Sequence, residues 1–448
     1  MGIFGLLLAL AVLIFLALRG VNIIIAALTS SIIVLVTNDL NIAEGLTQSF
    51  AFGKLGAFSF FGRFFLLFLA GAIFGKLMTT SGAAGSIAHA LAEKLGAQRS
   101  LWIIVLATAL LTYGGVLVFV VIFSIYSFGV QLIERAHIPK RLMVGAVALG
   151  AGTFTLTAMP GTPSLNNVIA ASALGTDLYA APVLGIVGSI LMLGLGMWYL
   201  ERERIRVVDS SLADKVVEHD DTLPNWVLSL APMAIVLMTI AFPKVVGSST
   251  DGETGSYLQK AADFALGQPI FWPSLALFLG SLSLFFLFKR ARQQFVADLG
   301  MAADSAIMPL LNTSMVIGFA AVVTQTASFK WFVETMTTID LPPVLSMLAS
   351  VSVISAITGS SSGGLQIFMQ TMAQSYIDIG IPPEVVHRLS AMASGGFDSL
   401  PHCGAVIAIL IIMESNHRES YKEMAIVTVA IPVVATLATA AFAWLVYL

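Results

Sequence analysis

Residues 394–404 read SGGFDSLPHCG and residues 150–167 read GAGTFTLTAMPGTPSLNN. They interrupt two long apolar runs, at 383–413 and 141–176. Glycine and proline break helices, and non-helical backbone does not face lipid because each unpaired N–H or C=O group costs several kcal/mol there. We therefore expect two broken helices near the midplane of a bilayer, with interruptions that are buried in protein or line a water-filled cavity.

The composition of the whole chain is typical of a multi-spanning membrane protein. Of its 448 residues, 58% are hydrophobic and 10% are charged, whereas about 25% of the residues of soluble domains are charged. The net charge of −3 and the absence of a long basic cluster argue against binding to nucleic acid. The single cysteine, Cys403, excludes an internal disulfide and a thiolate metal cluster within one chain. We expect neither a metal site nor a cofactor.

Eight further apolar runs are close to the roughly 20 residues that a bilayer span needs. They are 2–18, 21–37, 58–78, 179–200, 225–242, 272–289, 302–324 and 423–446. The first is expected to be a membrane helix and not a cleaved signal peptide, because it lacks a charged leading segment and a small-residue cleavage site. The runs 101–133 and 342–378 are too long for one span and carry small residues in the middle, which predicts two re-entrant hairpins.

Basic residues orient these segments. The sequences ERERIR at 201–206 and KRAR at 289–292 follow two separate spans, so both are expected in the cytoplasm. Counting outward from them gives an all-α polytopic fold of ten spans and two opposed hairpins, with both termini outside. Arg63 and Lys76 are expected to snorkel from the two ends of their span.

The two halves carry the same order of elements in inverted orientation. We expect a first repeat at 1–200, a cytoplasmic linker at 201–224 and a second repeat at 225–448, each repeat with five spans and one hairpin. Gly152 and Gly395 each lie 13 residues after the proline of an Ile-Pro pair. Inverted repeats with interrupted helices at matching positions indicate a transporter site near the midplane.

The first break is neutral and polar, since no ionisable residue occurs between Arg141 and Asp177. A half-helix that begins inside the membrane presents free N–H groups and a partial positive charge, which favour a carboxylate. Thr162 or Ser164 is expected to cap that half-helix. The alternative is a proline-kinked helix packed by small residues. The candidate substrate ligands here are Thr157, Gly161, Thr162, Asn166 and Asn167.

The second break holds the ionisable candidates. Asp398 is about equally far from Glu384 and Glu414, so it should lie near the bilayer centre, where a carboxylate is costly and indicates function. His402 follows four residues later and titrates near neutral pH. Either would carry a coupling proton. The alternatives are a helix cap for Asp398 and a structural hydrogen bond for His402. Ser399 is a further candidate substrate ligand.

The predicted hairpin tips are rich in small residues, which let backbone approach a ligand closely. The candidate ligands at these tips are Thr112, Gly114 and Gly115 in the first hairpin and Ser360, Ser361, Ser362, Gly363 and Gly364 in the second.

Three segments resemble the gluconate permease (GntP) family of bacterial proton symporters, within the ion-transporter superfamily. They are TLTAMPGTP at 155–163, GSSSGG at 359–364 and ASGGFDSLPH at 393–402. They are most similar to the branch of 3-hydroxybutyrate permeases, whereas the gluconate branch has histidine in the first break. The resemblance implies a multi-pass protein of the inner membrane, a homodimer, and an elevator-type transporter whose hairpins and broken helices move against a scaffold.

The expected function is secondary active transport, with proton-coupled symport of a short hydroxy-monocarboxylate such as 3-hydroxybutyrate. An anion that enters against an inside-negative potential costs about 2.3 kcal/mol per charge per 100 mV, and one proton cancels that charge. The alternatives are a symporter for gluconate, another sugar acid or a dicarboxylate, sodium coupling through Asp398 and broken-helix carbonyls, and an uncoupled channel. We do not expect an enzyme, because Asp398 and His402 form only a thin catalytic constellation. The partners are a small organic anion and the lipid bilayer.

Overall fold

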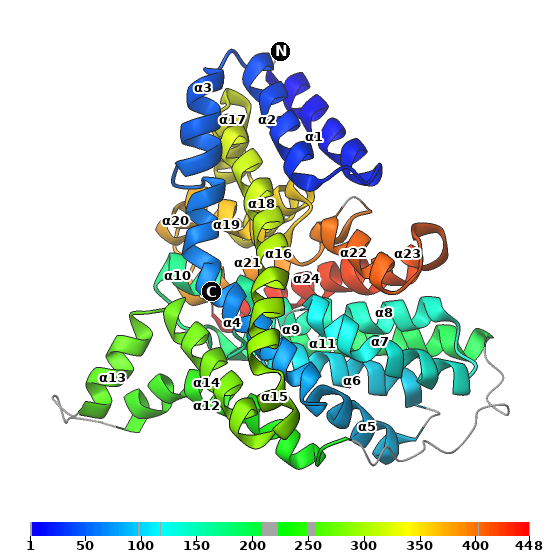
Figure 1. Cartoon of the computed structure of the whole chain (residues 1–448). Coiled ribbons are helices and arrows are strands. Elements are labelled where there is room, and N and C mark those ends of the chain that lie inside the picture. The colour runs from blue at the N-terminus through cyan, green and yellow to red at the C-terminus, as the bar shows by residue number, and fades with distance from the viewer. Residues whose placement is uncertain are drawn as a thin grey trace.

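The structure is a computed structural model that describes residues 2–96, 99–116, 118–207, 223–249, 257–401 and 403–447. Every regular element in these ranges is a helix, and none of them contains a β-strand (Figure 1). The predicted all-α fold class is confirmed.

Two long helices from different halves of the chain run through the middle of the molecule (Figure 1). These are α4 (Ala57–Thr80) and α16 (Phe295–Val323), and they pack along each other. Small residues allow the close approach, which drives helix association in membranes. A Cβ added to Gly318 of α16 would lie 3.0 Å from the Cβ of Ala57.

Each of these two central helices is packed against a helix from the other half of the chain. α2 (Ile23–Thr37) of the first half packs on α16, while α14 (Phe271–Leu287) of the second half packs on α4. α2 is joined by α1 (Gly2–Leu18), and α4 is preceded by α3 (Ile42–Glu44) and the π-helical turn Gly45–Phe52. α14 is joined by α12 (Trp226–Ser249) and α15 (Lys289–Gln293), and α13 (Tyr257–Leu266) packs on α12.

Interrupted helices occupy the four ranges in which the sequence predicts hairpins and broken spans. The range 101–133 holds α6 (Ser100–Tyr113) and α7 (Val118–Arg135), and 342–378 holds α18 (Pro343–Thr358), α19 (Ser361–Thr371) and α20 (Ala373–Asp378). The range 141–176 holds α8 (Lys140–Gly152), α9 (Phe154–Thr157) and α10 (Leu165–Leu174). The range 383–413 holds α21 (Pro383–Ser394), the 3-10 turn Phe397–Ser399 and α22 (Gly404–Ile412).

Several helices meet the length and apolarity that a membrane span needs. Among the described residues, five continuous ones do so: Ile42–Thr80, Pro182–Val207 (α11), Trp226–Val246, Phe295–Val323 and His417–Val446, which contains α23 (His417–Ala425) and α24 (Ile431–Val446). The number is up to seven if each of two bent pairs, Tyr257–Leu266 with Phe271–Leu287 and Pro383–Ser399 with Gly404–Ile412, is one span. The count of ten spans stays a prediction.

Three helices occupy segments to which the sequence assigned no membrane span. α13 lies between the predicted spans 225–242 and 272–289. α5 (Ala83–Leu95) and α17 (Ala327–Thr338) each follow one of the two central helices and precede one of the hairpins. All three are too short or too polar to stand out as spans.

Lys76 does not simply snorkel from the end of its span. Its Nζ lies 3.8 Å from Oδ1 of Asp298, whose side chain is completely buried at the start of α16. Arg63, in the same helix as Lys76, donates from Nη2 to the hydroxyl of Ser172 in α10 at 2.9 Å. Both cations are therefore held by partners from other helices.

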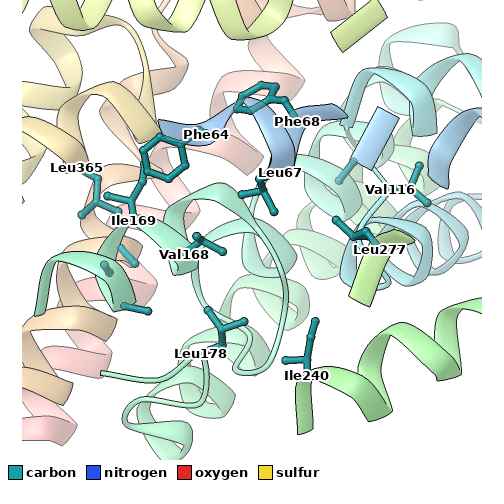
Figure 2. Close-up of a cluster of buried hydrophobic side chains, with 14 of the residues drawn as sticks. Phe64, Leu67, Phe68, Val116, Val168, Ile169, Leu178, Ile240, Leu277 and Leu365 are labelled. Carbon is teal, nitrogen blue, oxygen red and sulfur yellow. The ribbon is translucent and has the colours of Figure 1, made fainter. Parts of the chain in front are cut away.

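The two half-helices α10 and α19 pack against each other, beside α4 (Figure 2). Figure 2 shows Phe64 of α4 with its ring next to Ile169 of α10 and Leu365 of α19. All three side chains belong to one buried apolar cluster. Ile169 and Leu365 are the fifth residues of their helices, so the two half-helix N-termini lie at matching distances from this contact.

Candidate functional site

The first break separates the single turn α9 from the half-helix α10. Pro160 and Pro163 contribute no N–H groups between the two helices. Ser164 is the N-cap residue, and its hydroxyl accepts a hydrogen bond from the N–H of Asn167 at 3.4 Å and donates to the carbonyl of Leu156 at 2.7 Å. Of the two predicted caps, the structure therefore selects Ser164. The hydroxyl of Thr162 is buried and has no hydrogen-bond partner among the described residues.

Gly161 closes this break over the segment that leads into α11. Its φ of +79° lies in the left-handed region that favours glycine. Its N–H donates to the carbonyl of Leu178 at 2.9 Å, and an added Cβ would lie 2.6 Å from the ring of Tyr179. Gly161 is thus required by the shape of the turn.

The two adjacent asparagines at the start of α10 have different environments. The amide nitrogen of Asn167 donates to the carbonyls of Thr162 and Leu178 at 2.8 and 2.9 Å, and its oxygen lies 2.8 Å from Nε2 of His387. Asn166 donates to the hydroxyl of Ser394 at 3.0 Å. The side chain of Asn167 is therefore fully used within the protein, which weakens its prediction as a substrate ligand.

The second break holds Asp398 in the 3-10 turn Phe397–Ser399. This carboxylate is half-buried, and Oδ1 accepts a hydrogen bond of 3.0 Å from the hydroxyl of Ser399. Ser361, at the start of α19, also interacts with it. No Lys or Arg nitrogen of the described residues lies within 4.0 Å of it. His402 lies outside the described residues.

The tip of the first hairpin rests on the first break. The hydroxyl of Tyr113 donates to the carbonyl of Pro160 at 3.1 Å, and a Cβ on Gly115 would lie 3.0 Å from Cγ of Pro163. The hydroxyl of Thr112 donates to the carbonyl of Thr108 within its own helix, at 2.8 Å. The neighbouring Gly114 packs on Met233 of α12.

The tip of the second hairpin lies at the second break. Ser360 caps α19 and accepts a hydrogen bond from the N–H of Gly363 at 3.1 Å. Ser361 and Ser362 are buried in the first turn of the helix. Gly364 is packed so closely on the preceding arm that an added Cβ would overlap with Ser355.

The two breaks are in direct contact. A Cβ added to Gly395 would lie 2.6 Å from Cγ2 of Thr157, and the hydrogen bond between Asn166 and Ser394 lies nearby. Each hairpin tip touches the break of its own half, and the breaks touch each other. The described candidate residues therefore belong to one contiguous region. Several of its polar side chains are bonded within the protein, namely those of Thr112, Thr157, Asn166, Asn167, Ser360 and Ser399.

Sequence reasoning missed two residues of α21 that hold this region together. His387 is fully buried between Thr176, whose hydroxyl is 2.7 Å from Nδ1, and Asn167. Arg388 is fully buried beside it and donates only to backbone carbonyls of the first half. One signal was available, because Arg388 lies inside the predicted span 383–413 and ionisable residues within spans indicate function.

A small cavity lies behind the first break. Its volume is about 40 Å³, which is enough for a few water molecules. Its lining includes Thr176, Tyr179, Trp272 and an ion pair in which Nζ of Lys244 is 2.9 Å from Oδ2 of Asp177. The cavity is too small for a sugar acid and does not include Asp398.

Comparison with known proteins identifies relatives of this architecture. The family model described as GntP family permease matches residues 1–393. The chain is 34% identical over 449 residues to the Uncharacterized transporter YxjC of Bacillus subtilis, with 94% of each chain covered. It is 27% identical over 281 residues to the High-affinity gluconate transporter of Escherichia coli, which covers 61% of this chain and 59% of that protein.

A solved structure has a similar fold. The YdaH transporter of Alcanivorax borkumensis superposes with a TM-score of 0.53 over 85% of each chain, at 14% sequence identity. At this identity the similarity concerns the fold alone.

Proposed function

The chain belongs to the GntP permease family and is therefore a secondary transporter and a multi-pass bacterial membrane protein, and we propose that it carries a short hydroxy-monocarboxylate into the cell together with a proton. The observation that carries this proposal is the position of Asp398, a carboxylate that is bonded to Ser399 and lies beside the serine-rich start of α19. The inner membrane is the proposed location, and two copies of the chain are the proposed assembly.

The proposed carboxylate site lies at the starts of α10 and α19. Both half-helices begin inside the protein at a serine cap, and both pack against each other. The N–H groups of a helix start and its partial positive charge favour an anion. The hydroxyls of Thr162, Ser361 and Ser362 are near these starts, and that of Thr162 is free of partners among the described residues.

The proposed substrate has one carboxylate because, among the described residues of the two breaks, no cationic side chain is left to pair with a second one. Arg388 is the cationic side chain at the first break, and its guanidinium is occupied by four hydrogen bonds to carbonyls. A dicarboxylate would bury a second negative charge without a partner, which is costly. Hydroxyl and amide groups suit a substrate that has one carboxylate and one or more hydroxyls, such as 3-hydroxybutyrate.

Gluconate is the second candidate substrate, since the Escherichia coli relative is named for it. Gluconate is also a hydroxy-monocarboxylate, so both candidates share the same chemical class. They differ in the number of hydroxyl groups, and a site built to bond each of them would discriminate strongly against a substrate that lacks them.

The proposal for coupling assigns the proton to Asp398. A proton that joins this carboxylate when an anionic substrate binds would keep the moving part of the protein electrically unchanged. A single carboxylate with hydroxyl partners and no basic partner within 4.0 Å among the described residues is suited to this exchange. The hairpins and broken helices form the proposed moving part of an elevator, and α4, α16 and the helices around them form its scaffold.

Transport by the purified protein in proteoliposomes tests the proposal. With potassium or choline as the only cations, an inward proton gradient is expected to drive uptake of labelled 3-hydroxybutyrate. An excess of unlabelled gluconate tests whether the two acids share the site, and succinate is the dicarboxylate control. Uptake that responds only to a sodium gradient would exclude the proton version, and transport of succinate alone would exclude the substrate class.

A further inference from the structure

Arg388 is a fully buried cation whose hydrogen-bond partners among the described residues are all backbone carbonyls. Its Nε donates to the carbonyl of Ala180 at 3.0 Å and its Nη1 to that of Ala158 at 3.1 Å. Its Nη2 donates to the carbonyls of Leu178 and Ala180 at 3.2 and 2.9 Å. Arg388 comes from the second broken helix, and all of these carbonyls come from the first half of the chain.

One of these carbonyls, that of Ala158, lies where the first break leaves helix geometry. Ala158 is the C-cap residue of α9, and carbonyls at a helix C-terminus lack intrahelical partners and carry partial negative charge. Leu178 and Ala180 lie in the segment that leads into α11, and this segment is tied to the break by the bond from the N–H of Gly161 to Leu178. The guanidinium thus joins the break to this segment.

The positive charge of Arg388 is not neutralised by an ion pair. Among the described residues, no carboxylate oxygen lies within 4.0 Å of its nitrogens. Asp177 contributes to its electrostatic environment, but that carboxylate is bonded to Lys244 at 2.9 Å. Converging carbonyls at the end of a half-helix are the groups that coordinate sodium in transporters with broken helices. Here a side chain supplies the charge.

The rest of α21 holds Arg388 in this place. The ring of His387, the preceding residue, lies between Thr176 and Asn167, with its two nitrogens 2.7 and 2.8 Å from their side-chain oxygens. A guanidinium is planar, remains charged and is suited to several carbonyl partners at once. These contacts fix the position of the guanidinium relative to the first break, whereas a loosely bound ion would be free to leave.

We propose that Arg388 is a built-in cation that takes the place of a diffusible sodium ion at the first break and holds this break in the shape that binds the substrate carboxylate. The inference rests on the proposed function for its substrate, and it adds that the first break needs no sodium. Arg388 is a positioning residue, since its nitrogens bond to the protein and not to the substrate.

Chemical rescue of an arginine variant tests this inference. Arg388→Ala is expected to lose about tenfold or more of substrate exchange, because buried carbonyls lose their donors. Guanidinium ion at millimolar concentration, and sodium ion, are expected to restore exchange several-fold, whereas choline is not. Exchange between equal solutions needs no proton gradient, so its outcome does not depend on proton coupling. Arg388→Lys, which keeps a charge but lacks the planar fork, should retain partial activity without added cation.

Arg63→Ala is the matched control. Arg63 is also an arginine of a membrane helix, but among the described residues its guanidinium donates one hydrogen bond, to Ser172. Neither guanidinium nor sodium should change the exchange of this variant. Wild-type exchange in Arg388→Ala without any added cation would overturn the inference. A loss that neither cation restores would also overturn it, since Arg388 would then act by packing alone.

A second measurement uses proteins that keep Arg388. The apparent Tm of the wild type in detergent is expected to be the same in sodium and in choline. If sodium stabilises the wild type, the same comparison is made with Asp398→Asn. If the stabilisation by sodium is absent in Asp398→Asn, sodium binds at the second break. This result supports the inference that Arg388 already fills the first break. Stabilisation that persists in this variant would indicate that sodium binds outside the second break, as it would at a first break that Arg388 does not fill. This result would overturn the inference. A failure of the proposed function can be distinguished from the outcomes of both experiments. It would appear as the absence of proton-driven uptake by the wild type.

Discussion

The side-chain amide of Asn166 donates a hydrogen bond of 3.0 Å to the hydroxyl of Ser394, which links the two breaks across 228 residues of sequence. The hydroxyl of Ser394 in turn donates to the carbonyl of Ala391 at 2.7 Å. Loss of either partner leaves a buried polar group unsatisfied, which costs about 1–3 kcal/mol. We expect Asn166→Ala and Ser394→Ala each to lower the apparent Tm and the exchange rate.

A double-mutant cycle measures this link directly. Because both single variants remove the same bond, the double variant should be less impaired than the sum of the two, with a coupling of about 0.5–3 kcal/mol. Ser390→Ala is the control, since Ser390 is buried one turn earlier in α21 and donates only to the carbonyl of His387. Strictly additive losses would show that the two breaks are not coupled through this bond.

Asp398→Asn tests the coupling role of the second break. The amide keeps the size of the side chain but does not exchange a proton. We expect proton-driven uptake in proteoliposomes to be lost, while exchange of labelled for unlabelled substrate continues. Asp378→Asn, at the exposed end of α20, is the control and should behave as the wild type, because Asp378 bonds only to the neighbouring Gln374. If Asp398→Asn still accumulates substrate against a gradient, Asp398 is not the proton carrier.

Local patterns predicted where the helices begin and end. The run 101–133 was predicted from its apolar length and central glycines, and the structure holds Ser100–Tyr113 and Val118–Arg135 there. The first break was predicted from Pro160 and Pro163, which lie three residues apart on either side of Gly161 and each remove a backbone N–H donor. Helix ends of this kind depend on a few neighbouring residues, so a single sequence contains all the information needed to predict them.

Contacts between distant residues were not predictable in the same way. Nothing near Arg388 in the sequence indicates that its partners are the carbonyls of Ala158 and Ala180, since backbone acceptors leave no trace in residue type. Asn167 was predicted as a substrate ligand because amides suit that role, but its amide is used by Thr162, Leu178 and His387. Lys76 and Asp298 are 3.8 Å apart although neither sequence neighbourhood suggests the other.

The ion pair between Lys244 of α12 and Asp177 joins the proposed scaffold to the segment that bonds Arg388. Both side chains are partly exposed, so this pair should contribute about 0.2–1 kcal/mol. Lys244→Gln is expected to change the exchange rate by less than about fivefold, and this difference should vanish near 1 M salt, where the Debye length is about 3 Å. Lys260→Gln on the exposed face of α13 is the control. A difference between Lys244→Gln and the wild type that is the same at low and high salt would contradict an electrostatic role.

Gly152 and Gly395 occupy matching places in the sequence, 13 residues after an Ile-Pro pair, but their surroundings differ. A Cβ on Gly152 meets no atom within 4 Å, whereas a Cβ on Gly395 would lie 2.6 Å from Cγ2 of Thr157. Gly152→Ala should therefore be neutral or slightly stabilising. Gly395→Ala should be destabilised by about 1–3 kcal/mol, the usual effect of overpacking a close contact.

Removal of the opposing methyl group provides the decisive comparison. Thr157→Ser lacks Cγ2, and the nearest remaining atoms of residue 157, Oγ and Cβ, would lie 3.3 and 3.4 Å from the new Cβ on residue 395. The serine also keeps the hydroxyl that donates to the carbonyl of Thr153 at 3.1 Å. We expect Thr157→Ser alone to be nearly neutral and to restore the apparent Tm and exchange rate of Gly395→Ala. Equal behaviour of Gly152→Ala and Gly395→Ala, or no restoration by Thr157→Ser, would mean that the two breaks do not meet at this contact in the functioning transporter.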